Sequence, residues 1–225
     1  MAESVKYFGT YTDNFGTTEI VIENNFENLT IEIDGVKFIG YEFSSLAIAD
    51  KSQYSEQQLG RFTLRTKSKY LCNCSFRFTI DVILIDKIGN EEIANELIIQ
   101  YELGKEQKNS REGLDFEKVK LILSVEQSEF VGEGNHFETA FDEIQRQFNN
   151  RYCFKNCYGC MYGDYSVYGQ SGFGTMRCYV SQKEKYLKVR NKQEYMELSD
   201  DYKQVQEIYC CEKYEIRKVG VGYRG

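Results

Sequence analysis

The sequence of 225 residues contains no proline, no tryptophan and a single histidine, His136. Average usage predicts about eleven prolines in a chain of this length, and both missing residues need G/C-rich codons. We therefore expect an A/T-rich microbial genome. One histidine excludes enzymes whose chemistry needs several. The sequence also has no phosphate-binding glycine loop, serine nucleophile elbow or HExxH metalloprotease motif.

Long apolar runs are also missing. The most apolar stretch is Val82–Ile85, far short of the roughly eighteen residues that a membrane span needs. Residues Met1–Lys6 are polar, with no basic region that leads into an apolar stretch as in a signal peptide. We expect a soluble, cytoplasmic protein with no membrane partner. In that reducing compartment, eight cysteines predict buried thiols, metal ligands or a reactive thiol rather than disulfides.

Charge and cysteine are unevenly distributed along the chain. The net charge is -7. Hydrophobic residues make up 41% of the sequence, a content that predicts a folded chain. Residues 1–150 carry 15 basic and 26 acidic side chains, residues 151–225 carry 13 and 9, and six of the eight cysteines follow residue 150. We predict two parts: an antiparallel β-sandwich-like domain over 1–130, and a helix with a Cys- and Tyr-rich zinc-binding region over 131–225.

Short strands dominate the first part. Asp34-Gly35 separates Thr30–Ile33 from Val36–Ile39, which predicts a hairpin with a type I′ turn. Apolar residues alternate from Leu71 to Asp86, the pattern of a strand with one buried face, and this places Cys72 and Cys74 in the core. The other predicted strands are 19–23, 61–66, 97–103, 119–125 and 203–217. The fold class is therefore α+β, mainly antiparallel β.

One amphipathic helix is predicted after Asn135. Phe137, Ala140, Phe141, Ile144 and Phe148 follow helical spacing, so they form one apolar stripe that packs on the sheet. Asn135 is the expected N-cap, with Glu138 three residues later in a partial capping box. A second, short helix is expected around 193–198.

The second part carries a cysteine cluster. Cys157 and Cys160 form a C-x2-C pair, and Gly159 and Gly163 supply backbone freedom for a tight metal-binding turn. The other two ligands of a tetrahedral zinc site would be Cys178 and Cys211. Because neighbouring strand residues point to opposite faces, only one of the adjacent Cys210 and Cys211 can bind. Four cysteine ligands leave no open position, so this zinc would be structural.

Other interpretations of the cysteines remain open. The thiols could be small buried hydrophobic groups, as free cysteines often are. Cys153 or Cys210 could instead be a reactive thiol, with His136 as its base, in a cysteine-thiolate enzyme or redox protein. His136 is otherwise a surface residue in the first turn of the helix.

Tyrosines crowd the same region and predict a binding surface for a protein partner. Rigid, amphipathic rings beside glycine and serine give a large contact area at low entropy cost. The candidate partner-binding residues are Tyr162, Asp164, Tyr165 and Tyr168. The alternative is that these rings pack around the metal. The overall acidity argues against nucleic acid as the partner.

The C-terminal third carries the motifs of a resemblance. They are Gly163-Asp164-Tyr165-Ser166-Val167-Tyr168-Gly169, Phe173-Gly174, Cys178-Tyr179, Val205-Gln206-Glu207 through Cys211, and Gly222-Tyr223-Arg224-Gly225. The chain resembles a bacterial family of unknown function that has a Cys-containing Ser-Asp-Tyr-Ser-Pro-Tyr-Gly motif and ends in Gly-Tyr-Arg-Gly. Gly163 and Val167 depart from that pattern. Cys160, Cys178 and Cys211 fall at motif positions, which favours Cys211 over Cys210. The resemblance implies no activity.

We expect a non-catalytic protein-binding module with a structural zinc. One concrete version is a bacterial immunity protein, which would neutralise a cognate toxin by covering a basic active site with acidic surface. The alternative is the cysteine-thiolate enzyme or redox protein described above.

Overall fold

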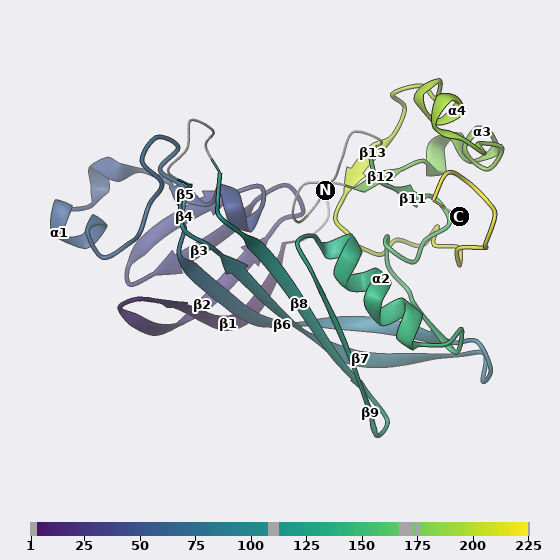
Figure 1. Cartoon of the computed structure of the whole chain (residues 1–225), viewed down its shortest axis with the longest axis horizontal. Coiled ribbons are helices and arrows are strands. Elements are labelled where there is room, and N and C mark those ends of the chain that lie inside the picture. The colour runs from purple at the N-terminus through teal and green to yellow at the C-terminus, as the bar shows by residue number, and fades with distance from the viewer. Residues whose placement is uncertain (1–3, 108–112, 167–172, 174–175, 225) are drawn as a thin grey trace.

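The computed structural model describes residues 4–107, 113–166, 173 and 176–224. Most of the chain forms one ten-stranded antiparallel sheet (Figure 1) with the order β5-β4-β3-β2-β1-β6-β7-β8-β9, and β10 pairs with β6. The strands are β1 Val5–Asp13, β2 Gly16–Asn24, β3 Leu29–Ile33, β4 Val36–Gly40, β5 Ala47–Ile48, β6 Cys74–Asp86, β7 Glu91–Leu103, β8 Glu117–Val125, β9 Ser128–Gly134 and β10 Tyr152–Phe154.

A smaller layer follows this sheet in the chain. Its three strands have the order β11-β12-β13, and it lies with α3 and α4 on the side of the molecule where α2 packs (Figure 1). These strands are β11 Gly163–Asp164, β12 Met176–Cys178 and β13 Lys203–Val205. The helices are α1 Glu56–Leu59, α2 Phe137–Gln147, α3 Lys183–Tyr186 and α4 Lys192–Met196, with 3-10 turns at Phe43–Ser45, Lys51–Gln53 and Val180–Gln182.

The prediction of mainly antiparallel β structure is confirmed, but the strands do not form two separate facing sheets. Strand β1 pairs with β2 along one edge and with β6 along the other, which joins the N-terminal hairpins and β6–β9 into one sheet. The sequence pattern predicted neither β1 nor β9, because apolar alternation is weak in both. The proposed division at residue 130 falls inside β9, and separate domains stay a prediction.

The predicted strand over 61–66 is wrong, and the one over 203–217 is confirmed only at its start. Residues 61–66 contribute only a single bridge between Leu64 and Leu71. In the stretch 203–217, strand β13 ends at Val205 and turns follow, which are closed by bonds such as Tyr214 N–H to the Cys211 carbonyl at 3.1 Å. Periodicity could not separate a strand from a series of turns here.

The β6 strand and the α2 helix bury the faces that the sequence predicts. Cys72 and Cys74 are buried, as expected for core residues at the start of the strand. In α2 the whole apolar stripe from Phe137 to Phe148 is buried against the sheet. The N-cap, however, is His136 and not Asn135, and its side chain makes no capping bond.

Two apolar clusters hold the molecule together. The larger lies between the main sheet and α2, and β10 adds the rings of Tyr152 and Phe154 to it. The smaller holds the C-terminal layer, where the Tyr179 and Tyr186 rings stack 5.0 Å apart and Tyr195 meets Tyr179 edge-on. The tyrosines of the C-terminal part are therefore divided between the two clusters, with Tyr158 and Tyr165 in the larger one and Tyr162 and Tyr179 in the smaller one.

The Asp34-Gly35 turn forms the predicted hairpin. Strands β3 and β4 pair with Ile33 opposite Val36, and the two turn residues have φ of 48° and 78°, as a type I′ turn requires. Only glycine adopts such angles without cost.

Replacement of Gly35 by alanine is expected to lower the free energy of unfolding by about 1–2 kcal/mol, because alanine is strained at this positive φ. Gly89→Ala is the matched control, since Gly89 also lies in a hairpin loop but has no left-handed φ. Urea unfolding of both variants measures the difference. Equal stabilities would contradict the assignment of the turn.

Candidate functional site

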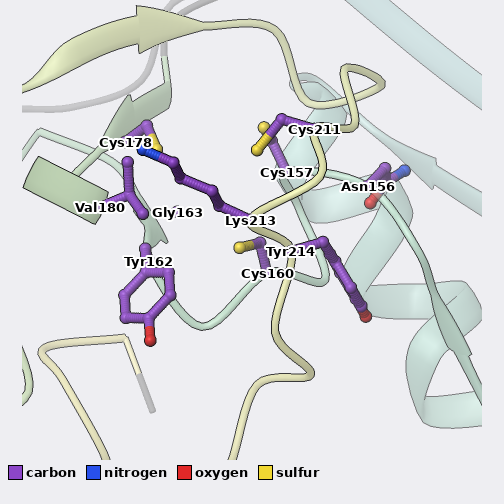
Figure 2. A pocket seen from close by; sticks show the side chains of 10 residues that line it. All are labelled: Asn156, Cys157, Cys160, Tyr162, Gly163, Cys178, Val180, Cys211, Lys213 and Tyr214. Carbon is purple, nitrogen blue, oxygen red and sulfur yellow. The ribbon is translucent and has the colours of Figure 1, made fainter. Parts of the chain in front are cut away.

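The four cysteines predicted as metal ligands border one small cavity. Cys157 and Cys160 lie in the loop after β10, Cys178 ends β12, and Cys211 lies in the turns that follow β13 (Figure 2). The cavity has a volume of about 10 Å³, which is room for a single particle the size of a water molecule. Residues separated by more than fifty positions thus meet at one point.

Backbone hydrogen bonds set this arrangement. The Cys157 N–H donates to the Tyr209 carbonyl at 2.6 Å, which ties the first cysteine loop to the C-terminal turns. The Cys160 N–H donates back to the Cys157 carbonyl at 3.3 Å and closes the tight turn of the C-x2-C pair. Cys178 pairs with Gly163 on one side and with Lys203 on the other.

Gly159 and Gly163 matter for a reason other than the one predicted. Neither has a positive φ, so left-handed backbone freedom is not what they supply. A Cβ at Gly159 would overlap the Phe154 carbonyl, and one at Gly163 would overlap the Cys157 carbonyl. The glycines therefore provide space for a close approach of backbone segments.

The two other C-terminal cysteines lie away from this cavity. Cys153 is buried in β10 and borders a different cavity. Cys210 is exposed, and its Sγ donates to the Cys211 carbonyl at 3.8 Å. Of the adjacent pair, only Cys211 borders the four-cysteine cavity, as the resemblance to family motifs favoured.

Two thiols of the cavity, those of Cys157 and Cys178, are held in their neutral form. Burial raises the pKa of Cys157, and the neighbouring Cys160 and Cys178 raise it further. Burial also raises the pKa of Cys178. A cation at the centre would reverse this preference, because metal binding requires thiolates and releases their protons.

The four sulfur atoms are suitable ligands for zinc, but their positions in this structure do not form a metal-binding site. Four sulfur ligands are the composition of a closed structural zinc site. Within the described residues, however, no three or more His, Cys, Asp or Glu side chains are arranged to hold a metal ion. Buried Asn156 borders the cavity, and its Nδ2 has no hydrogen-bond partner in the part of the chain that the structure describes. Lys213 runs across the cavity toward Cys178 (Figure 2).

The predicted partner-binding residues lie in the interior. Tyr162 and Asp164 are each 2% exposed and Tyr165 is 5% exposed, while Tyr168 lies outside the described residues. The Tyr186 hydroxyl donates to Asp164 at 2.7 Å, and the Tyr165 hydroxyl donates to buried Glu207 at 3.3 Å. These three side chains therefore stabilise the C-terminal layer and present no surface to a partner.

The structure contains a further site, a cluster of charged side chains around Arg224, which the sequence analysis did not predict. The Arg224 guanidinium bonds Glu138 at 3.2 Å and lies 3.5 Å from Asp142, so it binds the C-terminal segment to α2. It also donates to the Tyr158 carbonyl at 2.8 Å and covers the Tyr158 ring at 4.3 Å. The Gly-Tyr-Arg-Gly motif was the only sequence signal for this residue. We call Arg224, Glu138, Asp142 and Tyr158 the arginine clamp.

Glu138→Gln is expected to remove a pH dependence of stability. Burial raises the pKa of Glu138 from 4.5 to about 7, although Arg224 opposes the rise. The folded state then binds more protons than the unfolded state between these values, so this stabilisation is complete below about pH 4.5 and is lost as the pH rises through 7. Wild type should lose on the order of 2–3 kcal/mol over this interval.

Urea unfolding at several pH values measures this difference. The Glu138→Gln curve should be flatter than that of wild type, and the exposed control Glu129→Gln should follow wild type. Parallel curves for Glu138→Gln and wild type would contradict the assigned shift.

His136 is half-buried at the start of α2, and its Nδ1 lacks a partner among the described residues. It does not border the four-cysteine cavity. No helix in the described ranges is both long and apolar enough to cross a membrane.

The fold and the two clusters define a β-rich protein whose C-terminal layer brings four cysteines to one cavity and is tied to α2 by the arginine clamp. The chain belongs to the family of unknown function DUF6304, whose model matches residues 5–163. The match includes Cys157 and Cys160 and ends before Cys178 and Cys211. No curated protein and no solved structure matches the chain.

Proposed function

We propose that the protein is a non-catalytic protein-binding module whose C-terminal layer is stabilised by zinc on Cys157, Cys160, Cys178 and Cys211. The observation that carries the zinc proposal is that these four thiols, from three separate segments, border one cavity of about 10 Å³. Zinc binding would require the four side chains to turn so that their sulfurs meet on one ion. Zinc on four thiolates leaves two negative charges, and Lys213 at the cavity has the sign to compensate them.

The open face of the main sheet supports the binding role. Strands β1 to β4 and β6 to β8 bury one face, while the other carries exposed Phe8, Val21, Ile39 and Ile83. Two hollows of about 630 and 730 Å³ lie on this face. An apolar surface of this kind marks an interaction site in many proteins. We therefore assign the partner-binding role to this face and not to the predicted tyrosines, which the structure buries.

The charge of this face favours a basic partner. The hollow over β1–β4 is bordered by Glu19, Glu23 and Glu32 against two lysines, of which Lys6 is paired with Glu23 at 2.8 Å. Asp81 and Glu96 border the hollow over β6–β8, and none of its lining residues is basic. A basic toxin domain neutralised by a bacterial immunity protein is the concrete version of this partner.

Co-expression with a toxic, basic protein encoded beside its gene tests the binding role. The wild-type chain should restore growth, and Phe8→Asp should abolish the rescue, because Phe8 is 72% exposed at the centre of the apolar face. Ile88→Asp is the matched control, since Ile88 is 80% exposed in the β6–β7 loop. Failure of wild type to rescue, or equal rescue by Phe8→Asp, would contradict the proposal.

The alternative thiolate enzyme is not favoured by the electrostatics. A reactive cysteine needs a lowered pKa, whereas burial raises the pKa of Cys153 and partial loss of solvation at the thiol raises the pKa of Cys210. We therefore expect neither thiol to react with iodoacetamide at about pH 6 in the native state. Rapid alkylation of either would favour the enzyme.

A further inference from the structure

A second cavity, of about 300 Å³, lies between α2 and the C-terminal segment. Glu138, Asp142 and Gln145 of α2 form one wall, and residues 216–219 with Arg224 form another. The volume is that of a small-molecule pocket. We call it the α2 cavity.

The carboxylates of the α2 cavity are already occupied. Arg224 pairs with Glu138 at 3.2 Å and lies 3.5 Å from Asp142. Asp142 also accepts a hydrogen bond of 2.6 Å from the Tyr158 hydroxyl. The single positive charge of Arg224 therefore offsets part of the charge of the two carboxylates, and burial raises the pKa of Glu138 to about 7, which lowers the remaining negative charge further.

The remaining cations around the α2 cavity have no acidic partner. Lys87 and Lys218 border the cavity, and neither forms an ion pair within the part of the chain that the structure describes. The charge of Lys87 acts on Cys153 in the cavity wall, where it opposes the rise in the pKa of that thiol.

Arg217 adds a third positive charge. Its Nη2 donates to the Cys160 carbonyl at 2.8 Å and to the Gly163 carbonyl, and both acceptors are neutral. Its Nε and Nη1 are buried and have no hydrogen-bond partner among the residues that the structure describes, and the residue borders the α2 cavity. The nearby carboxylate of Asp164 feels this charge but forms no ion pair with it within the described residues.

Apolar groups complete the walls. Ile216 is partly exposed, Val219 is almost fully exposed, and both border the cavity together with Cys153. A chain with a net charge of -7 thus concentrates unpaired positive charge beside apolar surface at one cavity.

We propose that the α2 cavity binds a small organic anion, with a phosphate or carboxylate held between Lys87 and Lys218 and an apolar body against Ile216 and Val219. Charge-assisted hydrogen bonds from ammonium groups are among the stronger polar contacts. The α2 cavity shares no lining residue with the four-cysteine cavity or with the hollows of the open sheet face, so the anion would contact neither the four thiols nor the proposed partner surface.

Calorimetric titration of the full chain with phenyl phosphate and with benzoate, at constant ionic strength, tests this site. Both probes bind metal ions weakly, and benzyl alcohol is the uncharged control. At least one anion should bind saturably with one site per chain. The double variant Lys87→Met, Lys218→Met should bind at least about tenfold more weakly. Lys37→Met, on the sheet face, should bind as wild type does.

Two results would overturn the proposal. One is the absence of saturable binding of either anion to the wild-type chain. The other is equal affinity in wild type and the double lysine variant, with circular dichroism showing that the variant is folded. Binding of phenyl phosphate alone would assign the site to phosphate esters, and binding of benzoate alone to carboxylates.

Discussion

Replacement of Arg224 by methionine is expected to lower the free energy of unfolding by about 3–5 kcal/mol. The guanidinium is only 13% exposed, its partner Glu138 is 15% exposed, and the pair links the C-terminal segment to α2. Methionine fills similar space but leaves Glu138 buried without its cation. The stacking on Tyr158 and the hydrogen bond to its carbonyl are lost as well.

A double-mutant cycle separates the charge from the packing. In the combined variant Arg224→Met, Glu138→Gln, position 138 carries no charge that would be buried without a partner. Its loss of stability should therefore be smaller than the sum of the losses of the two single variants. Lys188→Met, at an exposed lysine, should change stability by less than about 0.5 kcal/mol. Urea unfolding measures all four. An Arg224→Met variant as stable as wild type would contradict the arginine clamp.

Serine substitution at Cys157 or Cys211 is expected to abolish zinc binding and to unfold the C-terminal layer. Structural zinc in small peptides contributes about 10–16 kcal/mol of binding free energy, which is folding free energy where the site does not exist beforehand. The small cluster around Tyr179 and Tyr186 then depends on the metal, because Cys160 belongs to that cluster.

The matched controls are Cys153→Ser and Cys210→Ser. Neither residue borders the four-cysteine cavity, so both variants should keep their zinc. Metal analysis and near-ultraviolet circular dichroism distinguish the two pairs, since the tyrosine signal reports the packing of the layer. Equal zinc content in Cys157→Ser and wild type would contradict the ligand set.

Local patterns were sufficient to predict some elements. The Asp34-Gly35 turn fixes its hairpin because few sequences tolerate two positive φ values, and the apolar stripe of α2 follows directly from helical spacing. In both cases the information lies within a few neighbouring residues. The N-cap of α2 was misplaced by one residue because His136 takes that position without a capping side chain.

Long-range pairing could not be predicted from the sequence. Nothing in β1 indicates that it pairs with β6 more than sixty residues later, and this pairing decides between one continuous sheet and a sandwich. The arginine clamp could not be predicted for the same reason, since Glu138 and Arg224 are distant in the chain. The buried Tyr162 and Tyr165 were mistaken for surface residues because composition does not reveal that Tyr162 packs in the smaller cluster and Tyr165 in the larger one.

Metal content of the untagged protein tests the central proposal most directly. Plasma mass spectrometry should find about one zinc per chain, and native mass spectrometry should show its loss together with folding when a chelator is added. Protein without zinc after purification at neutral pH, folded and unchanged by added zinc and by chelator, would contradict the structural zinc site and leave the four thiols as core packing.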